Sequence, residues 1–132
     1  MGDTLHIDQL RTTLGPEATE RFLRHARVVA DAEVAELVAQ VARHRDRAHA
    51  EATTNARLDL QLAERLAEAC VALLAEWPRL GPPERALVVG AVRYYVDQHD
   101  ADDDFGSSVG FEDDRRVIAF VLARVLPAHP SV

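Results

Sequence analysis

The sequence is poor in the residues that build disulfides, thiolate metal sites and membrane spans. Cys70 is the only cysteine in 132 residues, so an internal disulfide and a cysteine-based zinc site are both excluded. Its neighbours in EACVALL are mostly apolar, which predicts a buried, unreactive thiol. The longest uncharged apolar runs, such as ALVVGAV at 86–92, are far shorter than the roughly 20 residues that cross a bilayer. We therefore expect no membrane span.

Lysine is absent, and all 15 basic residues are arginine. They are outnumbered by 22 acidic residues, which gives a formal charge of -7. Nucleic acids and anionic lipids both present phosphate, so this charge argues against either as a partner. The N-terminal stretch MGDTLHIDQLRTTL also lacks the cationic start and apolar core of a secretory signal. We expect a cytoplasmic protein whose partner is another protein.

Apolar residues recur at intervals of three and four along most of the chain, and no long stretch alternates with period two. This pattern predicts an all-α fold, a compact bundle of five to six helices that forms a single domain over residues 1–132. The expected helices cover residues 3–14, 16–29, 31–50, 56–77, 83–98 and 112–126. The fifth is apolar over most of its surface, so we expect it at the centre of the bundle.

Two residues are expected to fix helix ends. Asp31 precedes an apolar stripe and is expected to cap the third helix. Trp77 closes the leucine face of the fourth helix, so its ring is expected to be buried and to anchor the linker RLGPP. The stripes at 31–50 and 56–77 are long for a small bundle, and their polar junction is expected to contribute to a homodimer contact.

Residues 99–114, HDADDDFGSSVGFEDD, place seven carboxylic acids between two apolar segments. Such crowding costs stability unless the acids face water, cap a helix, pair with arginine or share a cation. Capping is expected for Glu112, Asp113 and Asp114 in the first turn of the last helix, where the helix dipole favours negative charge.

Helix capping does not explain the acids at the N-terminal side of this segment. Asp97 and Asp100 lie at or just beyond the electronegative C-terminal end of the fifth helix. They are expected to need compensation, and Arg93, four residues before Asp97, is the nearest candidate along the chain. An arginine partner for these acids is therefore the second explanation.

A shared cation is the third explanation. Asp100, Asp102 and Asp104 have the spacing of the first ligands of a calcium loop, but the later glycine and glutamate fall one position late for an EF-hand. A looser Mg²⁺ or Ca²⁺ site would use Asp100 and Asp104 with Asp113 or Asp114. We hypothesise that these four aspartates form one compensated cluster in which arginine is favoured over metal.

The segment from about Leu87 to Leu126 carries two motifs, HDADDDF and GFEDD. Through these two motifs the segment resembles the YkvA-like family, a bacterial domain of unknown function. In that family two apolar helices flank an Asp-rich turn, whose pattern is I-D-x-x-P-D-F followed by G-[YF]-x-D-D. Polar residues stand here where that pattern has apolar residues and a proline. The resemblance implies a C-terminal helical hairpin with its acidic turn at one end, and it implies no catalytic residue. The positions that match are Asp100, Asp104, Phe105, Gly110, Phe111, Asp113 and Asp114.

The remaining reactive side chains show no catalytic pattern. The six histidines lack chelating spacing and are expected on the surface, and Ser107 and Ser108 lie in no nucleophile elbow. We therefore expect a small binding or regulatory module that presents the Asp-rich turn. The alternative is a Mg²⁺- or Ca²⁺-dependent enzyme that uses the clustered aspartates, for which a concave pocket beside them is required.

Overall fold

The computed structural model describes residues 7–54, 59–97, 108–130 and 132. Within these ranges the chain is all-α and contains no strand, which confirms the predicted fold class. No helix in the described part is both long and apolar enough to cross a membrane. The helices are α1 (Ile7–Leu14), α2 (Pro16–His25), α3 (Val34–Ala52), α4 (Leu60–Ala75), α5 (Pro82–Val96) and α7 (Ser108–Val125), with 3-10 turns at Asp31–Glu33 and Trp77–Arg79.

Proline, glycine and aspartate define several of the helix ends. Pro16 begins α2, as predicted, and the preceding Gly15 has a φ of 85°, in the left-handed region that favours glycine. Pro82 likewise begins α5, after Gly81, whose backbone is extended. Asp59 caps α4, because its Oδ1 accepts a hydrogen bond from the backbone N–H of Leu62 at 3.0 Å.

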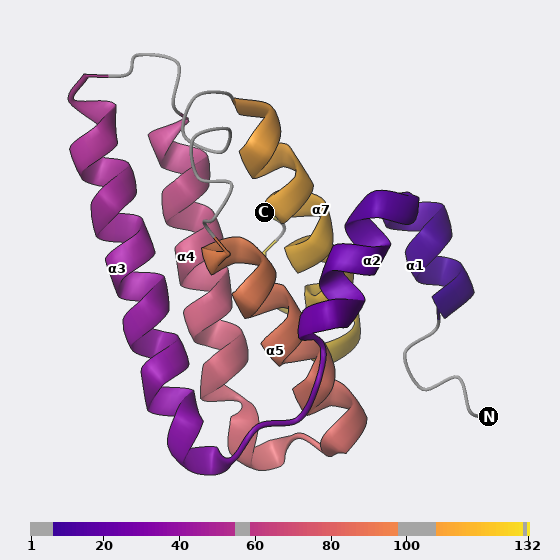
Figure 1. Ribbon diagram of the computed structural model, residues 1–132. Coiled ribbons are helices and arrows are strands. Elements are labelled where there is room, and N and C mark those ends of the chain that lie inside the picture. The colour runs from indigo at the N-terminus through magenta and orange to yellow at the C-terminus, as the bar shows by residue number, and fades with distance from the viewer. Residues whose placement is uncertain (1–6, 55–58, 98–107, 131) are drawn as a thin grey trace.

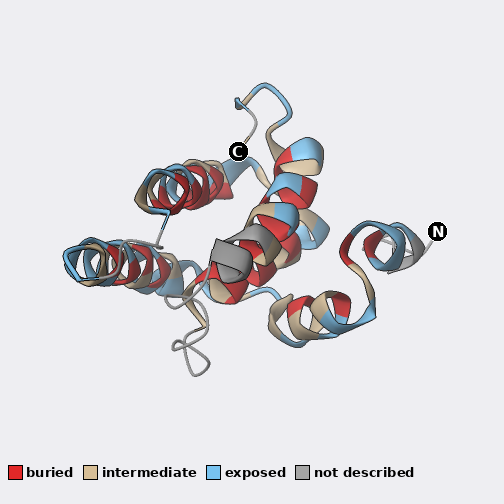
Figure 2. Cartoon of the chain, turned by 90° about the horizontal axis from the view of Figure 1, so that it is seen from above, coloured by how far each residue is buried: buried red, intermediate tan, exposed pale blue. Residues whose placement is uncertain are grey.

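Helix α5 lies at the centre of the molecule and packs against α2, α3, α4 and α7 (Figure 1). Its residues from Leu87 to Val92 are buried, and so are Tyr94 and Tyr95. Helices α3 and α4 run antiparallel on one side of α5, while α1 and α2 lie on the other (Figure 1). Buried residues face the interior of the bundle along each helix (Figure 2). The prediction that this apolar helix is central is confirmed.

Gly90 lets α2 approach α5 closely. A Cβ atom at this position would lie 2.7 Å from Cε1 of Phe22 and 3.0 Å from Cβ of Ala26. Any larger residue would therefore push α2 outward. The ring of Phe22, which lies next to Gly90, is fully buried. The glycine in the middle of α5 thus determines where α2 sits.

Asp31 does not cap the third helix, contrary to the prediction. Neither the 3-10 turn that it begins nor α3 has a side-chain cap. Instead Oδ1 of Asp31 accepts a hydrogen bond from Nε1 of Trp77 at 2.8 Å. The reason is tertiary, since the N–H group of a buried indole needs an acceptor.

Trp77 is 4% exposed, which confirms its predicted burial. It also anchors the start of α5, because Arg85 donates to the Trp77 carbonyl oxygen from Nη2 at 2.8 Å and from Nε at 3.1 Å. The guanidinium Cζ of Arg85 lies 4.8 Å from the centroid of the indole ring. Asp31, Trp77 and Arg85 therefore tie the start of α3, the end of α4 and the start of α5 together.

Replacing Trp77 with alanine is expected to lower the free energy of unfolding by about 3–5 kcal/mol, because a large aromatic side chain leaves the core. Trp77→Phe keeps an aromatic ring and loses the N–H donor to Asp31, so its cost is expected to be smaller, about 1–2 kcal/mol. Urea denaturation followed by circular dichroism measures both values. A loss below about 1 kcal/mol for Trp77→Ala would contradict the anchoring role.

Candidate functional site

The four aspartates of the predicted cluster divide between two parts of the chain. Asp100 and Asp104 lie outside the described residues, so the convergence of all four remains a prediction. Asp113 and Asp114 lie in α7. Within the described ranges, no group of three or more His, Cys, Asp or Glu side chains is placed to hold a metal ion. The Mg²⁺ or Ca²⁺ site likewise remains a prediction, since two of its proposed ligands are not described.

The capping explanation for Glu112, Asp113 and Asp114 was wrong. Helix α7 begins at Ser108, four residues earlier than predicted, and its first turn carries no acid. Gly110 lies within the helix and does not end it. A glycine costs a helix only about 1 kcal/mol, so it is a weak stop signal. The acids are consequently in the second turn, away from the helix end.

Asp113 and Asp114 face different environments because successive helical residues point about 100° apart. Asp114 is 2% exposed and faces the core. Asp113 is 44% exposed, and its Oδ1 lies 3.7 Å from Nη1 of Arg116. The arginine explanation therefore fits Asp113. Asp113 and Asp114 do not form a single carboxylate surface.

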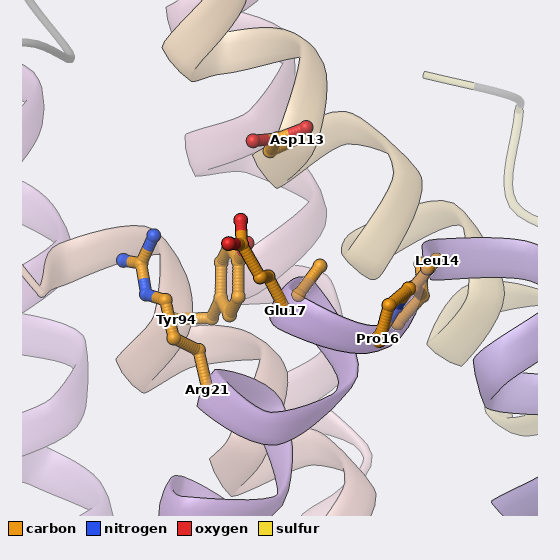
Figure 3. Close-up of a pocket in the computed structure, with 8 residues that line it drawn as sticks. Leu14, Pro16, Glu17, Arg21, Tyr94 and Asp113 are labelled. Atoms are coloured by element: carbon orange, nitrogen blue, oxygen red, sulfur yellow. The ribbon is translucent and has the colours of Figure 1, made fainter.

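Asp113 borders a pocket of about 360 Å³ where α1 ends and α2 begins, against α5 and α7. The side chains of Glu17 and Arg21 extend from α2 towards Tyr94 of α5, and Asp113 lies beyond them on α7 (Figure 3). We call this site the α2–α7 pocket. Its lining consists of Leu14, Gly15, Pro16, Glu17, Ala18, Arg21, Tyr94 and Asp113.

Arg21 is held in place by an aromatic ring and an acid. Its Cζ lies 4.4 Å from the centroid of the Tyr94 ring, and its Nη2 lies 3.9 Å from Oδ2 of Asp97. Nε2 of His25 is 3.1 Å from the same Asp97 oxygen. Two groups of α2 therefore compensate the acid at the electronegative end of α5. Arg93 does not have the role considered for it, because its Nη2 lies 3.7 Å from Glu33.

A second group of polar side chains lies inside the bundle. The ring of His44 on α3 packs edge-on against Tyr95 of α5, with centroids 4.4 Å apart. The Tyr95 hydroxyl donates a hydrogen bond to the carbonyl oxygen of Ala63 at 3.0 Å. Burial raises the pKa of the Cys70 thiol on α4, and the charge of Asp114 on α7 raises it further. The interior thus receives one of these polar side chains from each of α3, α4, α5 and α7.

The sequence-based expectations for two of these interior groups, Cys70 and His44, have different outcomes. Cys70 is fully buried, as predicted, and its raised pKa keeps the thiol protonated and unreactive. His44 is 2% exposed, so the expectation of surface histidines was wrong for it. A signal was present in the sequence, because Leu37, Val41, His44 and Ala48 follow one helical stripe and are all buried. The charged residues beside His44 obscured that pattern.

His44 makes stability depend on pH. Burial, with a smaller effect of the Arg47 charge, lowers the pKa of His44 from 6.5 to about 4. The unfolded chain therefore binds a proton that the folded chain excludes, and stability falls as the pH drops from 6.5 towards 4. The contribution of His44 to this loss is at most about 1.4 kcal/mol per pH unit.

The expected result is a free energy of unfolding that declines less steeply between pH 6.5 and pH 5 in His44→Leu than in the wild type, measured by urea denaturation. Tyr95→Phe is the control, because it keeps the aromatic contact with His44 and should keep the wild-type slope. Equal slopes in the wild type and His44→Leu would contradict the burial of a neutral imidazole.

Comparison of the chain with family models, with curated proteins and with solved structures finds no match. The resemblance to the YkvA-like family therefore stays a prediction, carried by the motifs at 99–105 and 110–114.

Proposed function

We propose that the protein is a binding module, and that the α2–α7 pocket receives a basic side chain of a protein partner. The observation that carries this proposal is the placement of two carboxylates from different helices, Glu17 and Asp113, at one concave site beside the Tyr94 ring. A volume of about 360 Å³ lies at the small end of ligand pockets, which suits a single side chain better than a large cofactor.

The charges of the pocket favour a cationic group. Arg21 lies against Tyr94 and close to Asp97, so its charge is already engaged at one edge of the pocket. The pair between Asp113 and Arg116 joins half-exposed side chains, and such pairs contribute little stability. An arriving ammonium or guanidinium group can replace Arg116 at low cost. The net charge of -7 also steers a basic partner towards this protein over long range.

A binding role agrees better with the pocket than metal-dependent catalysis does. Sites for Mg²⁺ or Ca²⁺ gather carboxylate and carbonyl oxygens, whereas this pocket places a guanidinium beside its carboxylates. The buried thiol of Cys70 and the buried imidazole of His44 do not line the pocket. A cytoplasmic location completes the proposal.

The test measures binding of a fluorescently labelled tetra-arginine peptide by anisotropy at low salt. Glu17→Gln and Asp113→Asn are each expected to weaken binding about fivefold to tenfold, because each removes one carboxylate from the pocket. Glu20→Gln is the matched control, since Glu20 is exposed on the same helix and does not line the pocket. Its effect is expected to stay below about twofold.

Two results would count against the proposal. An equal loss in Glu17→Gln and Glu20→Gln would mean that the peptide responds only to net charge. Failure of the wild-type protein to bind the tetra-arginine peptide more tightly than a tetra-glutamate peptide would remove the case for a cation-binding pocket.

A further inference from the structure

The outward side of the α3–α4 pair carries an apolar groove of about 340 Å³. Val38 on α3 and Val71 on α4 line it with 38% and 44% of their surface exposed. Only one other large hydrophobic side chain among the described residues, Val28, is comparably exposed. Clustering of two such residues in one groove marks the surface as a candidate interface.

Helix α3 carries a second stripe beside the one that faces the core. Val38, Ala42 and Arg45 line the groove and follow one another at intervals of four and three residues. On α4, Glu68 is followed by Val71 and Ala72 at three and four residues. These intervals are those of a coiled-coil seam, in which side chains of one helix fit between those of a facing helix. Small residues, Ala42 and Ala72 among them, let another pair of helices approach closely.

We propose that this groove is the surface on which a second copy of the chain docks, around a two-fold axis, to form a four-helix seam from two α3–α4 pairs. In a two-fold interface every contact occurs twice: if residue i of the first copy contacts residue j of the second, then residue j of the first copy contacts residue i of the second. A groove that is complementary to itself is therefore required.

The charges of the groove meet this requirement. Arg45 lies on the α3 wall and Glu68 on the α4 wall. A two-fold axis that runs along the groove, parallel to the two helices, therefore brings Arg45 of each copy to Glu68 of the other. Arg45 also lies 4.0 Å from Asp46, but the Arg45 side chain is half-exposed and that of Asp46 is largely exposed, so the pair contributes little. Two chains of charge -7 repel each other at long range, and a groove lined by one acid and one base avoids adding to that repulsion.

This interface leaves the α2–α7 pocket open. Helices α3 and α4 lie on one side of α5, whereas α1 and α2 lie on the other (Figure 1). A dimer through α3 and α4 would present two pockets on its outer sides, so a partner with two basic segments would bind with avidity. The inference does not depend on the pocket proposal, because the groove and the pocket share no lining residue.

Sedimentation velocity from low to high micromolar concentration tests the proposal on the full chain. The wild type is expected to shift from monomer to dimer. Val71→Glu is expected to weaken the dimer about tenfold or more, since the symmetric interface then buries two new acids. Val28→Glu is the matched control, because it places the same charge on an exposed valine outside the groove. Thermal melting checks that both variants remain folded.

A charge exchange tests the two-fold pairing directly. Arg45→Glu and Glu68→Arg should each weaken the dimer, and the double variant should recover most of the affinity. A wild-type chain that stays monomeric at every concentration would overturn the proposal, and the groove would then suit an amphipathic helix of another protein or an apolar ligand. A dimer unaffected by Val71→Glu, or affected equally by Val28→Glu, would also overturn it.

Discussion

Helix α5 is enclosed by α2, α3, α4 and α7, and the placement of these four helices around one core depends on that enclosure. A helix surrounded in this way must satisfy its polar groups inside the protein. Tyr95 does so by donating to the Ala63 carbonyl oxygen of α4. Enclosure also requires close packing. Gly90 has no side chain, so the Phe22 ring fits against it and α2 packs closely on α5. Packing around one helix therefore determines where the surface sites form.

The two proposed surfaces follow from the same arrangement. On one side, α2 lies close enough to α5 for Arg21 and His25 to contact the Asp97 carboxylate, and the junction of α1 and α2 leaves the α2–α7 pocket open. On the other side, α3 and α4 use one stripe each for the core. Their second stripe, which includes Val38 and Val71, stays exposed. Core packing thus uses only part of the apolar surface that these helices carry.

Periodicity in the sequence was sufficient to predict the helices and the central position of α5, because both depend on local patterns of apolar residues. Asp31 was assigned wrongly, since its partner is Trp77, 46 residues away along the chain. His44 and Asp114 were also missed as buried groups. His44 lies on the apolar stripe of α3, but the charged residues beside it obscured that pattern. Asp113 was selected as a site residue, but Glu17 was not, because the two meet only through the packing of α2 on α5 and α7.

Native-state hydrogen exchange measures most directly whether α5 is the element around which the fold is built. Amides in the middle of α5, from Val88 to Val92, should exchange only through global unfolding, because opening this helix disrupts its contacts with four others. Their exchange free energies should equal the free energy of unfolding from urea denaturation and should fall with urea at the same slope. Exchange of these amides at a lower free energy than those in the middle of α3 or α4 would contradict the account.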